Sequence, residues 1–181
     1  MTGAPERIEL RLHTVRQLFQ SLDPAPFHDK DLDPDAVAYI VGRARDLPRD
    51  AAFELAIELP SAEAQSEEVR GLETAIRGYF EWREEMAWRD LRLRLAEGRQ
   101  ALFMGVMFLA ACTLAREIIA AATDSPWLAW IEEGLTIVGW IAMWHPVDIF
   151  LYRWWPIRRE ALLNRRLARM NVALRFAAAA A

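Results

Sequence analysis

The sequence predicts an α+β membrane protein. A small β-α-α-β cytoplasmic domain is followed by a long juxtamembrane helix that continues into a two-helix transmembrane hairpin. Three observations predict it. Residues 7–12 and 52–59 alternate polar and apolar side chains, as half-buried strands do. Residues 66–122 lack proline and repeat apolar side chains at helical spacing. Finally, residues 101–122 and 127–152 are almost wholly apolar.

Charge is segregated along the chain in the same way. The 181 residues carry a formal net charge of −4, and the mean hydropathy is +0.00. Residues 1–82 carry nine basic and sixteen acidic side chains. Residues 101–152 carry one basic and five acidic side chains, and residues 153–181 carry seven basic side chains and one acidic side chain. The ordinary averages therefore conceal an acidic part, an apolar part and a basic part, and residues 153–181 are expected to form a basic cytoplasmic tail. A pI near 5.5, with arginines beside apolar runs, argues against nucleic acid as a partner.

The first domain is expected over residues 1–62. Its first strand, 7–12, is followed by a helix over 15–22 that the prolines after Asp23 end. Asp33 and Pro34 are the N-cap and first residue of a second helix, which runs to Leu47. The strand over 52–59 completes the unit. Two strands bury little apolar surface alone, so we expect this domain to pack on the long helix or on other copies.

The long juxtamembrane helix is expected over residues 63–100. Continued through residue 122 it would be on the order of 85 Å long, with a bend expected near Gly98. Its apolar side chains recur every three or four residues, at Val69, Leu72, Ile76, Tyr79, Phe80, Met86, Ala87, Leu91 and Leu95.

The hairpin over residues 101–152 provides two spans, about 101–122 and 127–152. Each is long enough for a hydrocarbon core of about 30 Å, which takes about 20 helical residues. The turn between them has no basic residue, whereas arginines flank the other ends. The positive-inside rule then predicts a membrane protein with both termini in the cytoplasm. A hairpin buried in a soluble core is the alternative interpretation.

Aromatic and basic side chains mark both expected membrane surfaces. Trp127 and Trp130 form the outer belt, and Tyr152 belongs to the inner one. The side chains expected at the lipid head groups are Arg92, Arg99, Arg153, Trp154, Trp155, Arg158 and Arg159.

Four charged residues fall inside the apolar runs: Arg116, Glu117, Glu132 and Glu133. An unpaired charge at the bilayer centre costs about 3 kcal/mol, so pairing is expected. One interpretation is a bridge from Arg116 to Glu132 or Glu133 that locks the hairpin or joins subunits. The other is a polar ring or ion path built from several copies.

A second polar cluster comprises His145, Pro146 and Asp148. Pro146 frees the carbonyl of Ala142 and tends to kink the helix. His145 and Asp148 lie three residues apart, on one helix face. We expect an interfacial cluster that positions the kinked helix; a proton relay or a metal site is the alternative.

Other chemistry has weaker signals. A divalent metal held by His13 and His28 with Asp29 or Asp31 is one interpretation, and helix capping by the acidic loop is the other. The loop lacks the glycine and the distal glutamate of a calcium loop. The single cysteine, Cys112, excludes an intrachain disulfide. The sequence holds no phosphate-loop, nucleophile-elbow, zincin or C-x-x-C motif. We therefore expect no catalytic residue, no metal and no cofactor.

Small residues in the apolar runs allow close helix approach and favour self-association. They are Gly105, Ala110, Ala111, Ala115, Gly134 and Gly139.

Residues 21–36 and 144–160 resemble a family of bacterial inner-membrane proteins of uncharacterised activity. The resemblance implies a small cytoplasmic N-terminal domain and a C-terminal hairpin, and it supplies no catalytic residue. The expected function is a homo-oligomeric membrane scaffold, anchor or partner-binding protein without catalytic activity. The lipid bilayer, other copies and a cytoplasmic protein are its expected partners. The alternatives are an oligomeric ion or proton channel that uses the intramembrane carboxylates, and a metal-dependent membrane enzyme.

Overall fold

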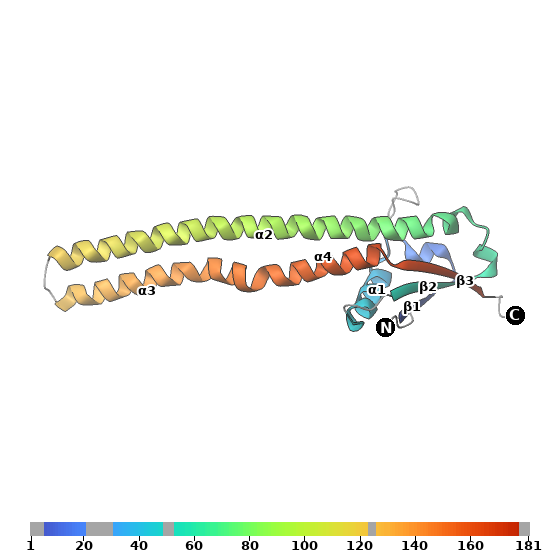
Figure 1. The fold of residues 1–181 in the computed structure, drawn as a ribbon, viewed down its shortest axis with the longest axis horizontal. Helices are drawn as coiled ribbons and strands as arrows, with labels where there is room; N and C mark the ends of the chain where they lie inside the picture. The colour runs from blue at the N-terminus through green and yellow to red at the C-terminus, as the bar shows by residue number, and fades with distance from the viewer. Residues whose placement is uncertain (1–5, 21–30, 49–52, 123–125, 178–181) are drawn as a thin grey trace, which may run out of the picture. The chain divides into compact units, whose positions relative to one another are not determined.

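A computed structural model describes residues 6–20, 31–48, 53–122 and 126–177. It divides into two compact units, Met1–Met86 with Glu160–Ala181, and Ala87–Arg159. In chain order the elements are β1 (Glu6–Arg11), the 3₁₀ helix η1 (Val15–Leu18), α1 (Pro34–Asp46), β2 (Phe53–Pro60), the 3₁₀ turn η3 (Ser61–Glu63), α2 (Glu67–Ala122), α3 (Pro126–Asp148), the π-helix η4 (Ile149–Arg153), α4 (Trp154–Ala168) and β3 (Asn171–Ala177) (Figure 1).

The first unit contains a three-stranded parallel sheet in the order β1-β2-β3. Ala56 on the central strand lies opposite Glu9 on β1 and Ala173 on β3. The mixed α and β class and the two predicted strands are confirmed. The third strand was not predicted, because residues 153–181 were assigned to a basic tail. The alternation of polar and apolar side chains in β3 is short and directly follows an arginine-rich helix. The strand that pairs with β3 is β2, which is distant in the sequence.

The chain leaves the sheet at the end of β2 and returns to it at β3. Everything between these neighbouring strands, from α2 to α4, forms one crossover connection. Parallel neighbours always need such a connection, because a tight turn cannot join them. Here the connection contains the whole helical hairpin, so both ends of the hairpin attach to one sheet.

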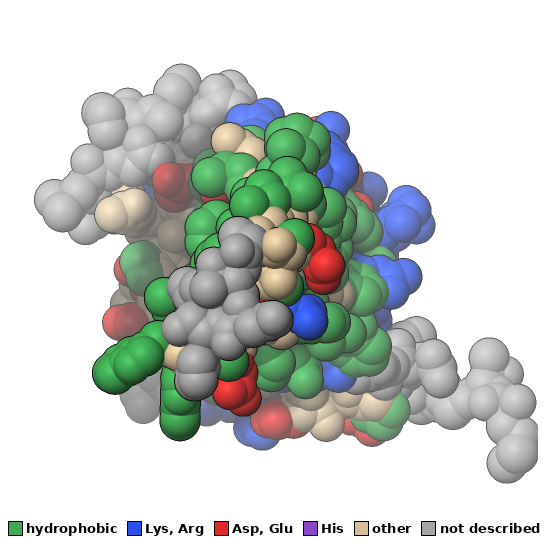
Figure 2. Space-filling model, turned by 90° about the vertical axis from the view of Figure 1, so that its left-hand side faces the viewer, with side chains coloured by type: hydrophobic (Ala, Val, Ile, Leu, Met, Phe, Trp, Pro, Cys, Tyr) green, Lys and Arg blue, Asp and Glu red, His purple; other side chains and the backbone are tan. Residues whose placement is uncertain are grey.

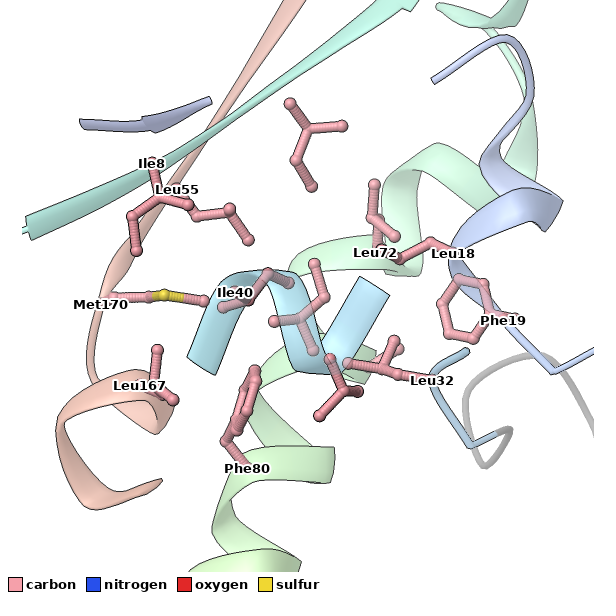
Figure 3. Packing of buried hydrophobic residues seen from close by; sticks show 14 of the residues in the cluster. Ile8, Leu18, Phe19, Leu32, Ile40, Leu55, Leu72, Phe80, Leu167 and Met170 are labelled. Carbon is pink, nitrogen blue, oxygen red and sulfur yellow. The ribbon is translucent and has the colours of Figure 1, made fainter. Parts of the chain in front are cut away.

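One face of the sheet forms the core of the first unit (Figure 3). Ile8, Leu55 and Ile57 lie on that face, and Leu72 and Phe80 of α2 are fully buried in the same cluster. The expectation that the domain packs on the long helix is confirmed, and the C-terminal part of α4 joins it through Leu167. Removal of this apolar surface from water is the main stabilising contribution.

The opposite face of the sheet is charged, which explains the alternation in β1 and β2. Arg7 pairs with Glu54 at 3.5 Å, and Arg11 with Glu58 at 2.9 Å. Glu54 also accepts a hydrogen bond of 3.0 Å from the Nδ2 of Asn171 on β3.

Helix α1 begins as predicted. Oδ1 of Asp33 accepts hydrogen bonds from the backbone N–H groups of Asp35 (2.9 Å) and Ala36 (3.3 Å), and Pro34 occupies the first turn.

The helix predicted over residues 15–22 is limited to η1. The backbone N–H of Asp33 donates to the carbonyl of Leu18 (2.8 Å), and that of Gln20 donates to Asp31 (2.9 Å). These bonds pair the chain with the segment before α1 and end the helix. Residue 22 lies outside the described residues.

Helix α2 continues through Gly98 without interruption, so the bend expected there is not a break in the helix. Glu67–Ala121 and Ala129–Ala168 are long and apolar enough to cross a membrane, by length and composition.

Candidate functional site: the helical hairpin

In the second unit, α2 and α3 run antiparallel and approach closely at three glycines (Figure 1). A Cβ on Gly98 would lie 2.8 Å from Cγ2 of Ile149, and one on Gly139 would lie 2.8 Å from Cδ1 of Leu109. A Cβ on Gly105 would lie 3.2 Å from the carbonyl oxygen of Ala142. The predicted close approach therefore occurs within one chain at these glycines.

The other small residues behave differently. A Cβ on Gly134 would meet nothing within 4 Å, and Ala110 and Ala111 are exposed. Their small size is not used by the packing of this chain on itself.

The outer surface of the hairpin is apolar and uncovered by the chain itself. Trp127, Trp130 and Trp144 are 83, 77 and 75% exposed. Hydrophobic side chains dominate the described surface seen from the turn of the hairpin (Figure 2). In the apolar 18-residue stretch of each of the two candidate helices, only 11 and 17% of the stretch is buried within the chain. A core helix of a soluble protein is mostly buried.

The four charges inside the apolar runs do not pair with one another. Arg116, Glu117 and Glu133 are exposed and Glu132 is half-buried. Among the described residues, none of the ion pairs joins Arg116 to Glu132 or Glu133. The bridge predicted within the hairpin is thus not formed, and the bridge between subunits stays a prediction.

The second polar cluster is also arranged differently from the prediction. The Nε of Arg153 donates to Oδ2 of Asp148 at 2.6 Å, so this carboxylate pairs across the π-helix η4 and not with His145. The wider turn of a π-helix brings residue i+5 close to residue i. Pro146 is fully buried, and His145 is exposed.

A pocket of about 580 Å³ lies between α2 and α3 in the second unit. We call it the hairpin groove. The sequence analysis singled out four of its residues, Gly105 on α2 and Ala142, His145 and Pro146 on α3, but it did not predict the other residues of α2 that line the groove. The signal that could have identified them is a row of side chains on α2, spaced three or four residues apart, that changes from polar at residues 97 and 100 to apolar at residues 104 and 108. The complete lining is Glu97, Gln100, Ala101, Met104, Gly105, Phe108, Ala142, His145 and Pro146.

The residues predicted at the head groups form an arginine–tryptophan cluster around η4. The indole N–H of Trp154 donates to the carbonyl of Phe150 at 2.7 Å. The guanidinium of Arg159 lies 4.5 Å from the ring centroid of Trp155, and that of Arg158 lies 5.8 Å from that of Trp154. These are cation–π distances.

The remaining predicted interface arginines lie on α2. Arg92 donates from Nε to the carbonyl of Trp88 at 3.3 Å, and Arg99 is exposed. Mixed aromatic and basic side chains of this kind suit a boundary between water and lipid.

The alternative metal site around His13 and His28 is not assembled among the described residues. His28 and Asp29 lie outside the described residues, and His13 is exposed. Within the described ranges, no group of three or more histidine, cysteine or acidic side chains is placed to hold a metal ion.

Comparison of the chain with protein-family models, with curated proteins and with solved structures finds no match. The resemblance noted from residues 21–36 and 144–160 therefore stays a prediction.

Proposed function

We propose that this chain is a homo-oligomeric integral protein of the bacterial inner membrane that acts as a scaffold, anchor or partner-binding protein. It would display its α+β domain in the cytoplasm. The observation that carries the proposal is the uncovered apolar surface of the hairpin, with exposed Trp127 and Trp130 at one end and Tyr152 and Trp155 at the other. Lipid covers such a surface at no cost, whereas water does not.

The crossover connection supports the proposed topology. Since β2 and β3 are hydrogen-bonded neighbours, both ends of the hairpin must emerge on the same side of any membrane that it crosses. The arginines at 153, 158 and 159, together with the lack of basic residues in the turn, favour the cytoplasm for that side.

The unpaired charges of the hairpin support assembly. An arginine or carboxylate within the apolar layer costs about 3 kcal/mol at its centre and less near the surface. Arg116 and Glu133 have no ion pair among the described residues of their own chain, so pairing between copies would remove this cost.

The sheet supports a role in binding a partner protein. In the part of the chain that the structure describes, β1 and β3 each pair with β2 alone. The outer edge of β3 therefore offers backbone N–H and C=O groups to an added strand, whereas on β1 the carbonyl of Glu9 already accepts a hydrogen bond of 3.1 Å from the hydroxyl of Tyr39.

Two measurements test this proposal. Resistance of the full chain to alkaline carbonate extraction is expected, together with a single oligomeric mass in lipid nanodiscs. Release into the soluble fraction contradicts membrane integration, and a monomeric mass contradicts the assembly.

The channel alternative is favoured by one observation: three carboxylates lie in the apolar runs with a single arginine, Arg116, and no ion pair among the described residues joins any of them to it. Proteoliposomes that show cation or proton flux, reduced by Glu117→Gln and by Glu132→Gln, would favour it over the scaffold. Flux that is absent or indifferent to both changes would exclude the pore.

A further inference from the structure

We propose that the hairpin groove binds one phosphatidylethanolamine molecule of the cytoplasmic leaflet. This inference rests on the membrane placement proposed above. It assigns to the groove a ligand with an ammonium-bearing head group and an acyl chain.

The lining of the groove changes from polar to apolar along the helix axis. On α2 it passes from Glu97 and Gln100 to Met104 and Phe108. The close contacts set the level of α3: Gly98 lies against Ile149, and Gly105 against Ala142. His145 therefore lies on the polar side of Ala142, because α3 runs in the opposite direction. Polar groups gather at one end of the groove, as they do in a lipid.

The direction of this gradient matches the proposed topology. The polar end of the groove is the end toward η4 and the arginine–tryptophan cluster at the start of α4, which is expected at the cytoplasmic surface. The apolar end extends toward the middle of the hairpin. A lipid of the cytoplasmic leaflet has the same orientation.

The length and the volume of the groove also fit. Residues 97 to 108 rise about 17 Å along a helix at about 1.5 Å per residue. Half of a hydrocarbon core of about 30 Å is about 15 Å, the depth of one leaflet. The 580 Å³ of the groove lie within the range of about 300–1,000 Å³ that is usual for small-ligand sites, so the groove suits the head group and part of one acyl chain, and the rest of the lipid lies outside it.

The charges at the polar end select the head group. The carboxylate of Glu97 is exposed and pairs with Arg94 at 3.3 Å. An ammonium group suits this carboxylate, and the neighbouring phosphate suits the amide N–H of Gln100 and the imidazole N–H of His145. A head group without an ammonium leaves Arg94 as the partner of Glu97 and adds no second cation beside this carboxylate.

Native mass spectrometry of the full chain, released from nanodiscs that contain equal phosphatidylethanolamine and phosphatidylglycerol, tests the proposal. We expect phosphatidylethanolamine to be retained at one molecule per chain. Ala101→Trp fills the groove and is expected to lower this occupancy about tenfold. Ala120→Trp is the matched control, because Ala120 is exposed on the same helix and does not line the groove.

A milder change keeps the test informative if Ala101→Trp fails to fold. Glu97→Gln is expected to remove the preference for phosphatidylethanolamine over phosphatidylglycerol, whereas Glu85→Gln, at an exposed position outside the groove, retains it. Retention of both lipids without preference, or an occupancy that no groove variant lowers, overturns the inference.

The outcome for membrane placement is separate. If the chain resists carbonate extraction but retains no lipid that depends on the groove, only the lipid site is contradicted. If carbonate releases the chain, both the membrane placement and the lipid site are contradicted. If Ala101→Trp dissociates the oligomer without changing the bound lipid, a second copy occupies the groove, and the lipid site is contradicted.

Discussion

The carbonyl oxygen of Ala142 lies over the backbone of Gly105, 3.2 Å from the place where a Cβ would stand. Pro146, four residues after Ala142, cannot donate the helical hydrogen bond that this carbonyl would accept. The facing glycine lets α2 come close enough for a Cα–H to approach the freed oxygen. The proline of α3 and the glycine of α2 are thus two parts of one packing arrangement.

Gly105→Ala should therefore destabilise the hairpin. The added Cβ would meet the Ala142 oxygen at 3.2 Å and Sδ of Met143 at 3.1 Å. Overpacking of this kind costs about 1–3 kcal/mol. Thermal unfolding in detergent is the measurement. The matched control is Gly134→Ala, where nothing lies within 4 Å and the better helix propensity of alanine predicts an equal or higher melting temperature. Equal melting of the two variants would contradict the packing described.

Phe80→Ala should unfold or strongly destabilise the unit that contains the sheet. Phe80 is fully buried, and truncation of a buried phenylalanine costs about 3–5 kcal/mol. Trp82, two residues later on α2, is 51% exposed, so Trp82→Ala is the control and should change stability little. Limited proteolysis of the domain compares them, and rapid cleavage is expected for the Phe80 variant alone.

The β2–β3 pairing predicts a specific crosslink. Cysteines introduced at Ala56 and Ala173, in a Cys112→Ser background, face each other across two neighbouring strands and should oxidise to a disulfide. The control pair, Ala56 with Ala177, is four residues out of register and should not crosslink. Faster migration on a non-reducing gel reports the closed loop. Equal crosslinking of both pairs would argue against the parallel register.

Arg116→Glu should weaken the oligomer, because it replaces the one cation of the hairpin charges with a fourth carboxylate. Combination with Glu133→Arg restores opposite charges and should restore assembly. Arg89→Glu is the control, since Arg89 is exposed on α2 outside the apolar runs. Mass photometry in nanodiscs measures the oligomer. If Arg116→Glu leaves the mass unchanged, pairing between copies is not what holds them together.

Local patterns were sufficient to predict several elements. The alternation at residues 7–12 and 52–59, the Asp33 cap and the long helix all depend on neighbours within a few residues, and the structure contains each of them. The direction of strand pairing has no such local signal. β3 was missed because the three apolar side chains at 172, 174 and 176 gain meaning only beside β2.

The candidate site was predicted only in part. His145 and Asp148 were paired by assuming an α-helical spacing, and the π-helix after Asp148 instead brings Arg153 to the carboxylate. The groove was missed for a related reason. Its lining comes from two helices, and the level at which Gly105 meets Ala142 cannot be read from either helix alone.

The hydrogen bond from Asn171 to Glu54 joins residues 117 positions apart. A ribosome adds about 5–20 residues per second, so this stretch takes on the order of ten seconds to synthesise. Throughout that time β2 is made but has an unpaired edge, which is the part of a sheet most prone to aggregation. The domain reaches its final form only once the second helix has returned to the side of the first. Completion of the sheet therefore requires that the chain first make both helices of the hairpin and then return to β2.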